Sequence, residues 1–221
     1  MDYLLISIDN ALRTLLAKPI ASRSVHENSL STSNKPFSDL SNSSKSQSQL
    51  SPDEQNLSGA LMRVNHVGEI CAQALYTSQS LATQNKSLKN YFKDASIDEF
   101  DHLAWTAERI EELGTHKSYL NPLWYAGAFG IGYLVAKIGG EQMSLGFVAE
   151  TERQVSEHLG SHLQKLPPSD LASRDIVKQM KLDEEAHAKK AVSSGAKELP
   201  PPVKQLMRVA AKLMTTTAHY V

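Results

Sequence analysis

The apolar and polar positions of the chain follow a helical period almost throughout. Near the start, Leu5, Ile8, Leu12 and Leu15 recur at the three- and four-residue spacing of one helix face. From residue 51 onward the apolar positions keep this period, and no long run alternates with the two-residue period of a strand. The pattern predicts an all-α protein, in which a short amphipathic helix precedes a larger helical domain.

Turn-forming residues divide the helical part of the chain into segments. Ser51, Pro52 and Glu54 resemble a helix start, with serine as the N-cap, proline at the first position and glutamate at the third. Further on, breaks are expected at 84–86, Gly114, Gly139-Gly140, Pro167-Pro168 and 200–202. We therefore expect helices at residues 52–83, 87–113, 122–137, 141–165, 169–194 and 200–217.

Composition divides the chain into three parts. Residues 1–19 contain the N-terminal amphipathic helix, and residues 20–52 are dominated by serine and asparagine. A stretch this polar buries too little apolar surface to offset the entropy of ordering it, so a flexible linker is expected. Residues 53–221 then form the helical domain, which is long enough to bury one core of ordinary size.

Two Glu-x-x-His motifs stand out in the helical domain. They are Glu99/His102 and Glu184/His187, and the chain contains no other match. Residues three apart share one face of a helix, so each motif points a carboxylate and an imidazole at the same place. One such motif alone is common on a solvated helix face, whereas its repetition indicates that both copies contribute ligands to a metal site.

Each motif also has a glutamate about thirty positions upstream. Glu69 lies 30 residues before the first motif glutamate, and Glu152 lies 32 residues before the second. Antiparallel helices place residues opposite each other when both are equally far from the turn. The two midpoints fall near Asn85 and between Pro168 and Ser169, where turn residues occur independently. Each half of the domain is therefore predicted to be a helical hairpin with its acids facing inward at the same depth.

Two such hairpins predict a ferritin-like four-helix bundle with four carboxylates and two imidazoles in its core. Ionised carboxylates at this density would destabilise the core unless they were compensated. Two divalent cations supply that compensation, and mixed carboxylate and imidazole ligands suit iron or manganese, whereas structural zinc favours thiolates. The predicted metal ligands are Glu69, Glu99, His102, Glu152, Glu184 and His187.

Residues near Glu152 leave alternatives open. Glu150 and Glu157 lie 34 and 27 residues before Glu184, so spacing alone does not exclude either of them as the ligand. His158 follows Glu152 by six positions and is expected near the metals. A surface histidine is an equally good interpretation of that residue.

An aspartate precedes the glutamate of each motif. Each aspartate is expected to hydrogen-bond the outer ring nitrogen of the opposite histidine, Asp98 to His187 and Asp183 to His102. Such partners orient a ligating imidazole and fix its tautomer. Asp101, by contrast, is expected to lie on a solvated helix face.

Charge and composition remove several classes of function. The 23 lysines and arginines nearly cancel the 24 aspartates and glutamates, so the chain lacks the basic footprint of a nucleic-acid partner. The single cysteine, Cys71, excludes an intrachain disulfide and indicates a reducing compartment. Gly130 and Gly132 lack the third glycine and the preceding strand of a dinucleotide site, so no nucleotide cofactor is predicted. Any electrons must then come from a partner protein or a diffusing reductant.

Residues 118–136 form a run of 19 uncharged residues with an apolar centre. By length the run is a borderline membrane span. A span at this position would separate the two halves of the predicted metal site. We therefore expect the segment to lie on or in a membrane surface, and a buried crossover between the halves is the alternative.

Four motifs, in this order, resemble those of the demethoxyubiquinol hydroxylase family of ubiquinone biosynthesis. They are Leu61-Met-Arg-Val-Asn-His-Val-Gly-Glu69, Asp98-Glu-Phe-Asp-His102, Glu150-Thr-Glu-Arg-Gln154 and Asp183-Glu-Glu-Ala-His187. The resemblance covers about residues 55–221. It implies a ferritin-like monooxygenase with two Fe ions per chain and extra apolar, membrane-associating helices. The same six residues would be the iron ligands.

The resemblance also implies a substrate, partners and a location. Members of the family use O2 to hydroxylate the benzoquinol ring of a polyprenylated intermediate at the membrane. The implied location is the cytoplasmic face of the bacterial inner (cell) membrane, as a peripheral protein. A reductase or other ubiquinone-biosynthesis proteins are the further implied partners. The alternatives are a soluble di-iron oxidase, peroxidase or RNA hydroxylase and a ferritin-type iron-binding protein, and the apolar segment argues against both.

Overall fold

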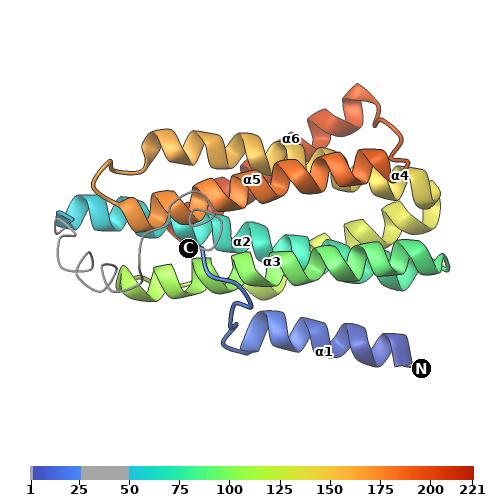
Figure 1. Ribbon diagram of the computed structural model, residues 1–221, viewed down its shortest axis with the longest axis horizontal. Helices are drawn as coiled ribbons and strands as arrows, with labels where there is room; N and C mark the ends of the chain where they lie inside the picture. Colours follow the sequence, from blue (N-terminus) through green and yellow to red (C-terminus); the bar gives the residue numbers. More distant parts are fainter. Residues whose placement is uncertain (1, 26–49) are drawn as a thin grey trace, which may run out of the picture.

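The computed structural model describes residues 2–25 and 50–221. Within these ranges the chain forms six helices and no strand (Figure 1), which confirms the predicted all-α class. The predicted Ser/Asn-rich linker falls mainly on residues 26–49, which lie outside the described residues. The helices are α1 (Asp2–Leu16), α2 (Pro52–Ala82), α3 (Lys86–Glu112), α4 (Asn121–Lys165), α5 (Leu171–Ser193) and α6 (Pro201–Tyr220).

Four helices form a bundle of the kind expected for a ferritin-like fold. The long axes of α2, α3, α5 and the second part of α4 run side by side (Figure 1), with α2 packed against α3 and α4, and α4 against α5. Helices α3 and α5 contact each other far less than these three pairs do. Helix α1 packs mainly against α2, and α6 packs against α2 and α4. The bundle therefore has one sparsely packed side, between α3 and α5.

The turns lie where the sequence predicts them. Ser51 caps α2 with a capping box, because its hydroxyl accepts from the backbone N–H of Glu54 while the Glu54 carboxylate accepts from the Ser51 N–H. Asn85 caps α3 by accepting from two backbone N–H groups of its first turn. Asp170 caps α5 by accepting from the Ser173 N–H at 3.0 Å. Each half of the bundle is thus a helical hairpin, as predicted.

Helix α4 contains the break expected at Gly139-Gly140. Gly140 has φ 71° and ψ −174°, a conformation that glycine adopts without steric cost, and the helix kinks there. Before the kink, Leu123, Leu134 and Ile138 are 56% to 82% exposed, so the segment is not a wholly buried crossover. Among residues 2–25 and 50–221, no helix combines the length and apolarity that crossing a membrane requires.

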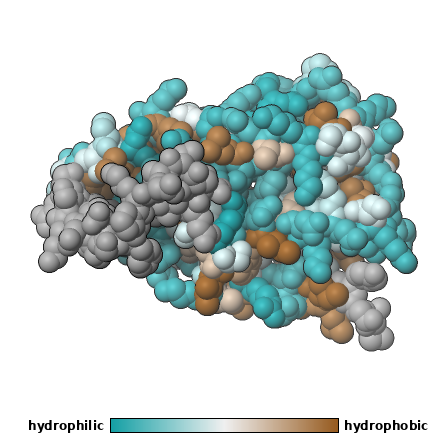
Figure 2. Space-filling model, in the orientation of Figure 1, coloured by the Kyte–Doolittle hydropathy of each residue, from teal (hydrophilic) through white to brown (hydrophobic). Residues whose placement is uncertain are grey.

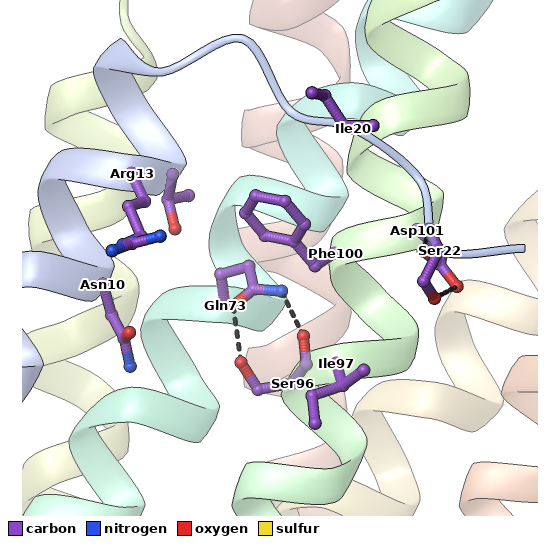
Figure 3. Close-up of a pocket in the computed structure, with 10 residues that line it drawn as sticks. Asn10, Arg13, Ile20, Ser22, Gln73, Ser96, Ile97, Phe100 and Asp101 are labelled. Atoms are coloured by element: carbon purple, nitrogen blue, oxygen red, sulfur yellow. Dashed lines mark hydrogen bonds between the residues drawn. The ribbon is translucent and has the colours of Figure 1, made fainter.

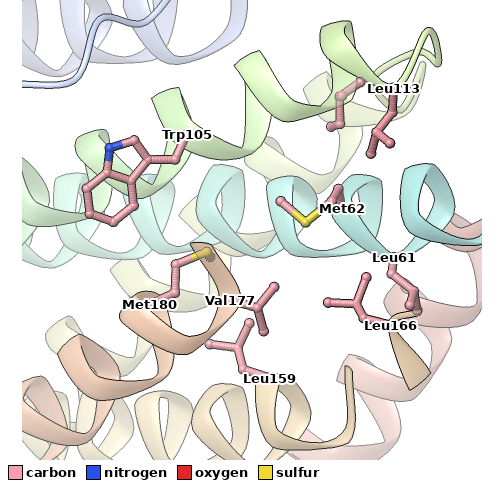
Figure 4. Packing of buried hydrophobic residues seen from close by; sticks show 9 residues of the cluster. Leu61, Met62, Trp105, Leu113, Leu159, Leu166, Val177 and Met180 are labelled. Carbon is pink, nitrogen blue, oxygen red and sulfur yellow. The ribbon is translucent and has the colours of Figure 1, made fainter. Parts of the chain in front are cut away.

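Two apolar clusters fill the bundle on either side of its middle. One contains Met62, Trp105, Leu159 and Met180, one from each helix from α2 to α5 (Figure 4). The other includes Tyr76, Phe92, Val148 and Ala191. Along each of the four helices the predicted ligands lie between residues of these two clusters. Close-packed side chains therefore flank the predicted site in both directions along the bundle.

The second part of α4 is held tightly against the segment that precedes α6. A Cβ atom added to Gly146 would lie 2.0 Å from the carbonyl oxygen of Lys197. The main chains can approach this closely only because position 146 carries no side chain. Nearby, the Lys197 N–H donates to the Gln142 carbonyl at 2.9 Å and fixes the contact.

Candidate metal centre

Carboxylates and imidazoles from both hairpins converge in the middle of the bundle. One ligand atom from each of Glu69, Glu99, His102 and Glu184 lies within 4.8 Å of the others, and all four residues are buried. Glu99 and His102 are completely inaccessible to solvent. The sequence placed these residues at one depth, and the structure brings them together.

The two histidines point the same ring nitrogen at the carboxylates. His102 Nδ1 lies 3.1 Å from Glu99 Oε2, 3.3 Å from Glu184 Oε1 and 3.7 Å from Glu69 Oε2. His187 Nδ1 lies 3.0 Å from Glu99 Oε1 and 3.7 Å from Glu184 Oε2. Glu99 and Glu184 thus lie between the two imidazoles, and each carboxylate faces both rings.

Glu152 joins the same cluster from α4. The Tyr76 hydroxyl donates a hydrogen bond to Glu152 Oε1, and both side chains are buried. Burial raises the pKa of Glu152 well above its usual value, and the negative charges of Glu184 and Glu99 raise it further. Geometry therefore favours Glu152 over its neighbours.

The neighbouring glutamates face elsewhere. Glu150 is buried, but its carboxylate pairs with Arg153 and accepts from Gln154 at 2.8 Å. Lys204 of α6 lies 3.8 Å from the same carboxylate. Glu157 is exposed. Each of these two glutamates therefore has surroundings that do not require a metal.

The outer ring nitrogens of the histidines meet the aspartates that the sequence assigned to them. His102 Nε2 lies 2.9 Å from Asp183 Oδ2, and His187 Nε2 lies 3.2 Å from Asp98 Oδ2. Burial tends to raise the pKa of Asp183, but hydrogen bonds with His102 and Arg23 outweigh it and lower that pKa to about 2. Both contacts cross from α3 to α5, so they also join the two helices that pack least against each other.

The protonation of the cluster shows how strongly it favours positive charge. Burial raises the pKa of Glu69 well above its usual value. Burial alone would lower the pKa of His102, yet its hydrogen bonds with Asp183, Glu184 and the other acids raise it well above 6.5. Burial would likewise raise the pKa of Glu99, but its contacts with His102 and His187 and the positive charges of these imidazoles lower it. The buried carboxylates thus favour positive charge at the imidazoles, where a cation would also be stabilised.

Buried polar atoms without hydrogen-bond partners test whether these side chains fit metal ions. His187 Nδ1 and Glu99 Oε1 are only 3.0 Å apart, yet among the described residues neither has a hydrogen-bond partner of acceptable geometry. Glu184 Oε2 is also buried and unpartnered within the described part of the chain. Buried polar atoms without partners are rare and costly. Since these three atoms lie close together in the core and do not satisfy one another, the set of ligand atoms fits metal coordination.

Other histidines and acids lie apart from the cluster. His158 packs on His162 at 4.1 Å between ring centroids, and none of its contacts within the described residues reaches the predicted ligands. His66 Nδ1 lies 3.0 Å from the Thr106 hydroxyl, and burial lowers its pKa to about 3. The expectation that Asp101 lies on a solvated face was wrong. Asp101 is 2% exposed, because Ser22 and Arg23, at the start of the predicted linker, cover it.

Two functional neighbours were missed by the sequence reasoning. Tyr76 lies seven residues after Glu69 on the same face of α2, so helical periodicity could have placed it beside the site. Arg23 contacts Asp183 at 2.7 Å from a distant part of the chain. No local pattern around Arg23 indicates that contact.

A cavity of about 260 Å³ lies beside the cluster, between α1 and the α2–α3 pair (Figure 3). Its wall includes Gln73 and Ser96, which exchange two hydrogen bonds of 2.7 Å. Gln73 is one turn beyond Glu69 in α2, and Ser96 is one turn before Glu99 in α3. These bonds therefore tie the two helices together next to the acidic ligands.

The fold and the cluster together define a class of protein. An all-α bundle that brings Glu and Glu-x-x-His side chains from two hairpins into its core belongs with the helical bundles that can hold metal between facing helices.

Comparison with known proteins then identifies the family. The sequence model described as "Ubiquinone biosynthesis protein COQ7" matches residues 56–218, and the chain belongs to this family. A relative from Polaromonas sp. (strain JS666 / ATCC BAA-500) is 53% identical over 220 residues, which covers 100% of this chain and 98% of the relative. A relative from Acidovorax sp. (strain JS42) is 52% identical over 221 residues and 100% of both chains. Both relatives are named 3-demethoxyubiquinol 3-hydroxylase. The resemblance seen in the sequence motifs is confirmed.

Proposed function

We propose that this protein is an O2-dependent di-iron monooxygenase, a 3-demethoxyubiquinol 3-hydroxylase. Its reaction would hydroxylate the benzoquinol ring of a polyprenylated intermediate in ubiquinone biosynthesis. The names of full-length relatives that are about half identical support this substrate. The observation that carries the proposal is the convergence of two imidazole Nδ1 atoms on the carboxylates of Glu99 and Glu184, each of which has one buried oxygen without a partner among the described residues.

The ligand set suits two iron ions. Four carboxylates balance the charge of two divalent cations, and the mixture of carboxylate and imidazole is one that iron prefers. When bound, iron would supply the redox chemistry that activates O2, which side chains alone do not provide. The residues that would hold it are Glu69, Glu99, His102, Glu152, Glu184 and His187.

The surrounding residues would orient the ligands and keep water out. Asp98 and Asp183 fix the two imidazoles so that each presents Nδ1 inward. Tyr76 holds Glu152 by donating a hydrogen bond to it, and burial raises the Tyr76 pKa, which keeps the hydroxyl protonated. The apolar clusters on both sides exclude bulk water from the site.

The overall reaction sets the requirement for electrons. One oxygen atom of O2 enters the ring as a hydroxyl group, and the other leaves as water. This balance needs two electrons and two protons for each ring hydroxylated. A reductase or a quinol would supply them, because the sequence contains no dinucleotide fingerprint.

Surface chemistry supports peripheral binding to the membrane in which a polyprenyl quinol resides. Apolar side chains are exposed on α1, on α6 and on the first part of α4, all of which lie outside the four-helix core. They include Leu5, Leu12 and Leu16 on α1, Leu123 and Leu134 on α4, and Leu206, Val209 and Leu213 on α6. The face shown in Figure 2 is largely hydrophilic, with apolar residues only in small separate groups. Under this proposal the N-terminal helix segment, residues 1–19, and the helical domain, residues 53–221, both contribute apolar surface that contacts the membrane. The protein would then lie on the cytoplasmic face of the inner membrane.

A quinone profile after deletion of the gene tests the proposed function. We expect the deletion strain to accumulate demethoxyubiquinone, measured by mass spectrometry, and the wild-type gene to restore ubiquinone. Glu99→Ala should not restore it, whereas Glu157→Ala should, because Glu157 is exposed outside the cluster. Normal ubiquinone levels in the deletion strain would remove the proposal.

A further inference from the structure

Residues 20–25 cross the sparsely packed side of the bundle. Figure 3 shows the chain that carries Ile20 and Ser22 passing over α3 beside Asp101. The Ser22 N–H and hydroxyl both donate to the Asp101 carboxylate, at 2.6 and 2.9 Å. This segment, which is the start of the predicted linker, is thus anchored on α3 next to His102.

Arg23 continues this contact across to α5. Its Nε donates to Asp101 Oδ2 at 3.1 Å, and its Nη2 donates to Asp183 Oδ2 at 2.7 Å. The guanidinium carbon lies 5.0 Å from the centroid of the Trp105 ring. The Trp105 indole N–H in turn donates to the Arg23 carbonyl at 3.1 Å. One side chain therefore bridges α3 and α5 at the level of the metal cluster.

The same carboxylate oxygen serves both Arg23 and the predicted ligand histidine. Asp183 Oδ2 accepts from Arg23 Nη2 and lies 2.9 Å from His102 Nε2. A carboxylate on the outer nitrogen of an imidazole strengthens that imidazole as a metal ligand. A guanidinium on the same oxygen draws off part of the negative charge. Arg23 thus sets both the position of Asp183 and the strength of its effect.

The other half of the site lacks this arrangement. His187 Nε2 lies 3.2 Å from Asp98 Oδ2, but the Asp98 side chain is 46% exposed, against 18% for Asp183. Within the described residues no lysine or arginine lies within ion-pair distance of Asp98. The two imidazoles therefore occupy electrostatically different surroundings, although their sequence motifs are the same.

We propose that Arg23 is a positioning residue of the metal centre. It fixes Asp183 on His102 and partly neutralises that carboxylate, so that the His102 side differs electronically from the His187 side. The inference rests on the proposed function, because it concerns how residues outside the ligand set tune bound iron.

Redox titration and Mössbauer spectroscopy of the iron-loaded protein test the inference. Arg23→Gln removes a positive charge near the centre, and the loss of this charge favours the oxidised iron. The midpoint potential of the iron in this variant should therefore fall below that of the wild type. One of the two iron signals should shift or broaden, and kcat should fall roughly tenfold with KM unchanged, as for loss of an outer-shell partner. Arg23→Lys keeps the charge but cannot bridge two carboxylates, so its potential should stay near wild type while one iron signal still changes.

Arg13→Gln is the matched control. Among the described residues Arg13 pairs with Asp9 alone, on the exposed surface of α1, so this variant should match the wild type in both measurements. If the potential and spectrum of Arg23→Gln equal those of the wild type, the inference is wrong. Should Arg23→Gln fail to fold, Arg23→Lys decides, since an unchanged spectrum in that variant also overturns the inference. Wild-type protein that binds no iron would refute the proposed function itself. This result differs from one in which the iron-loaded wild type and the iron-loaded Arg23→Gln variant have the same potential and spectrum.

Discussion

The two hairpins of the bundle contribute the same kinds of ligand but surround them differently. The α2–α3 half provides Glu69 and the first motif, and the α4–α5 half provides Glu152 and the second. Among the described residues, Glu152 is the only predicted ligand that accepts a hydrogen bond from a tyrosine, Tyr76. The aspartate behind one histidine is bridged by Arg23, and the aspartate behind the other is half exposed. A repeated motif thus fixes symmetric ligand geometry, while residues outside the repeat make the two sides unequal.

The largest difference between the halves is expected from the two aspartates. Asp183→Asn should weaken iron retention or kcat/KM by about 10- to 100-fold, because the enclosed carboxylate holds both His102 and Arg23. Asp98→Asn should have a smaller effect, since solvent can replace an exposed partner. Iron content after dialysis against a chelator, together with steady-state kinetics, measures both. Equal losses in the two variants would contradict the inequality of the halves.

A smaller effect is expected from the tyrosine found on one side only. Tyr76→Phe removes the hydroxyl that donates to Glu152, so the loss of iron to a chelator should accelerate by up to about tenfold. Tyr91→Phe is the control, because it removes a hydroxyl from the same apolar cluster, and among the described residues that hydroxyl makes no hydrogen bond to Glu152. Identical chelation rates for the two variants would show that this hydrogen bond does not hold the ligand.

The smallest effect concerns the histidines that each half buries outside the cluster. His66 on α2 has a hydroxyl partner, whereas His162 on α4 packs against His158 and leaves its Nδ1 unpartnered within the described residues. Burial lowers the pKa of His162 to about 3, below the 6.5 of an unfolded chain. The unfolded state therefore binds more protons as the pH falls below about 6.5, and folding stability declines until the folded pKa is reached.

Urea unfolding at pH 7 and pH 5.5 measures this contribution. Between these values the wild type should lose roughly 1 kcal/mol more stability than His162→Gln at the same metal content. His66→Gln should reduce the loss in the same way, because burial also lowers the pKa of His66 to about 3. A wild type whose stability falls no more steeply than that of either variant would show that these imidazoles titrate normally.

Local patterns were sufficient to predict the helical hairpins and the residues that converge in them. Asn85 and the prolines at 167 and 168 mark turns through their own conformational preferences. The ligand positions follow from helical period and from equal distances to those turns, so the depth of Glu69 and Glu99 could be calculated without a structure. Gly140 likewise marked a break, since only its backbone adopts the observed φ readily.

The contacts that the sequence did not reveal depend on long-range packing. Arg23 lies in a polar stretch without helical period, and its partner Asp183 is 160 residues away. Asp101 has the spacing of a solvated position on α3, and it is buried only because Ser22 and Arg23 cover it. Periodicity describes one helix at a time, so it cannot report which remote segment lies across a helix face.

The contact at Gly146 has a consequence for comparing this chain with its relatives. Any larger residue would have to displace α4 or the segment around Lys197, and Glu152 lies six positions further along the same helix. Glycine is therefore the only residue type that this position accepts without movement of the main chain. A glycine shared by all relatives at this position would reflect helix packing and would not indicate a role in catalysis.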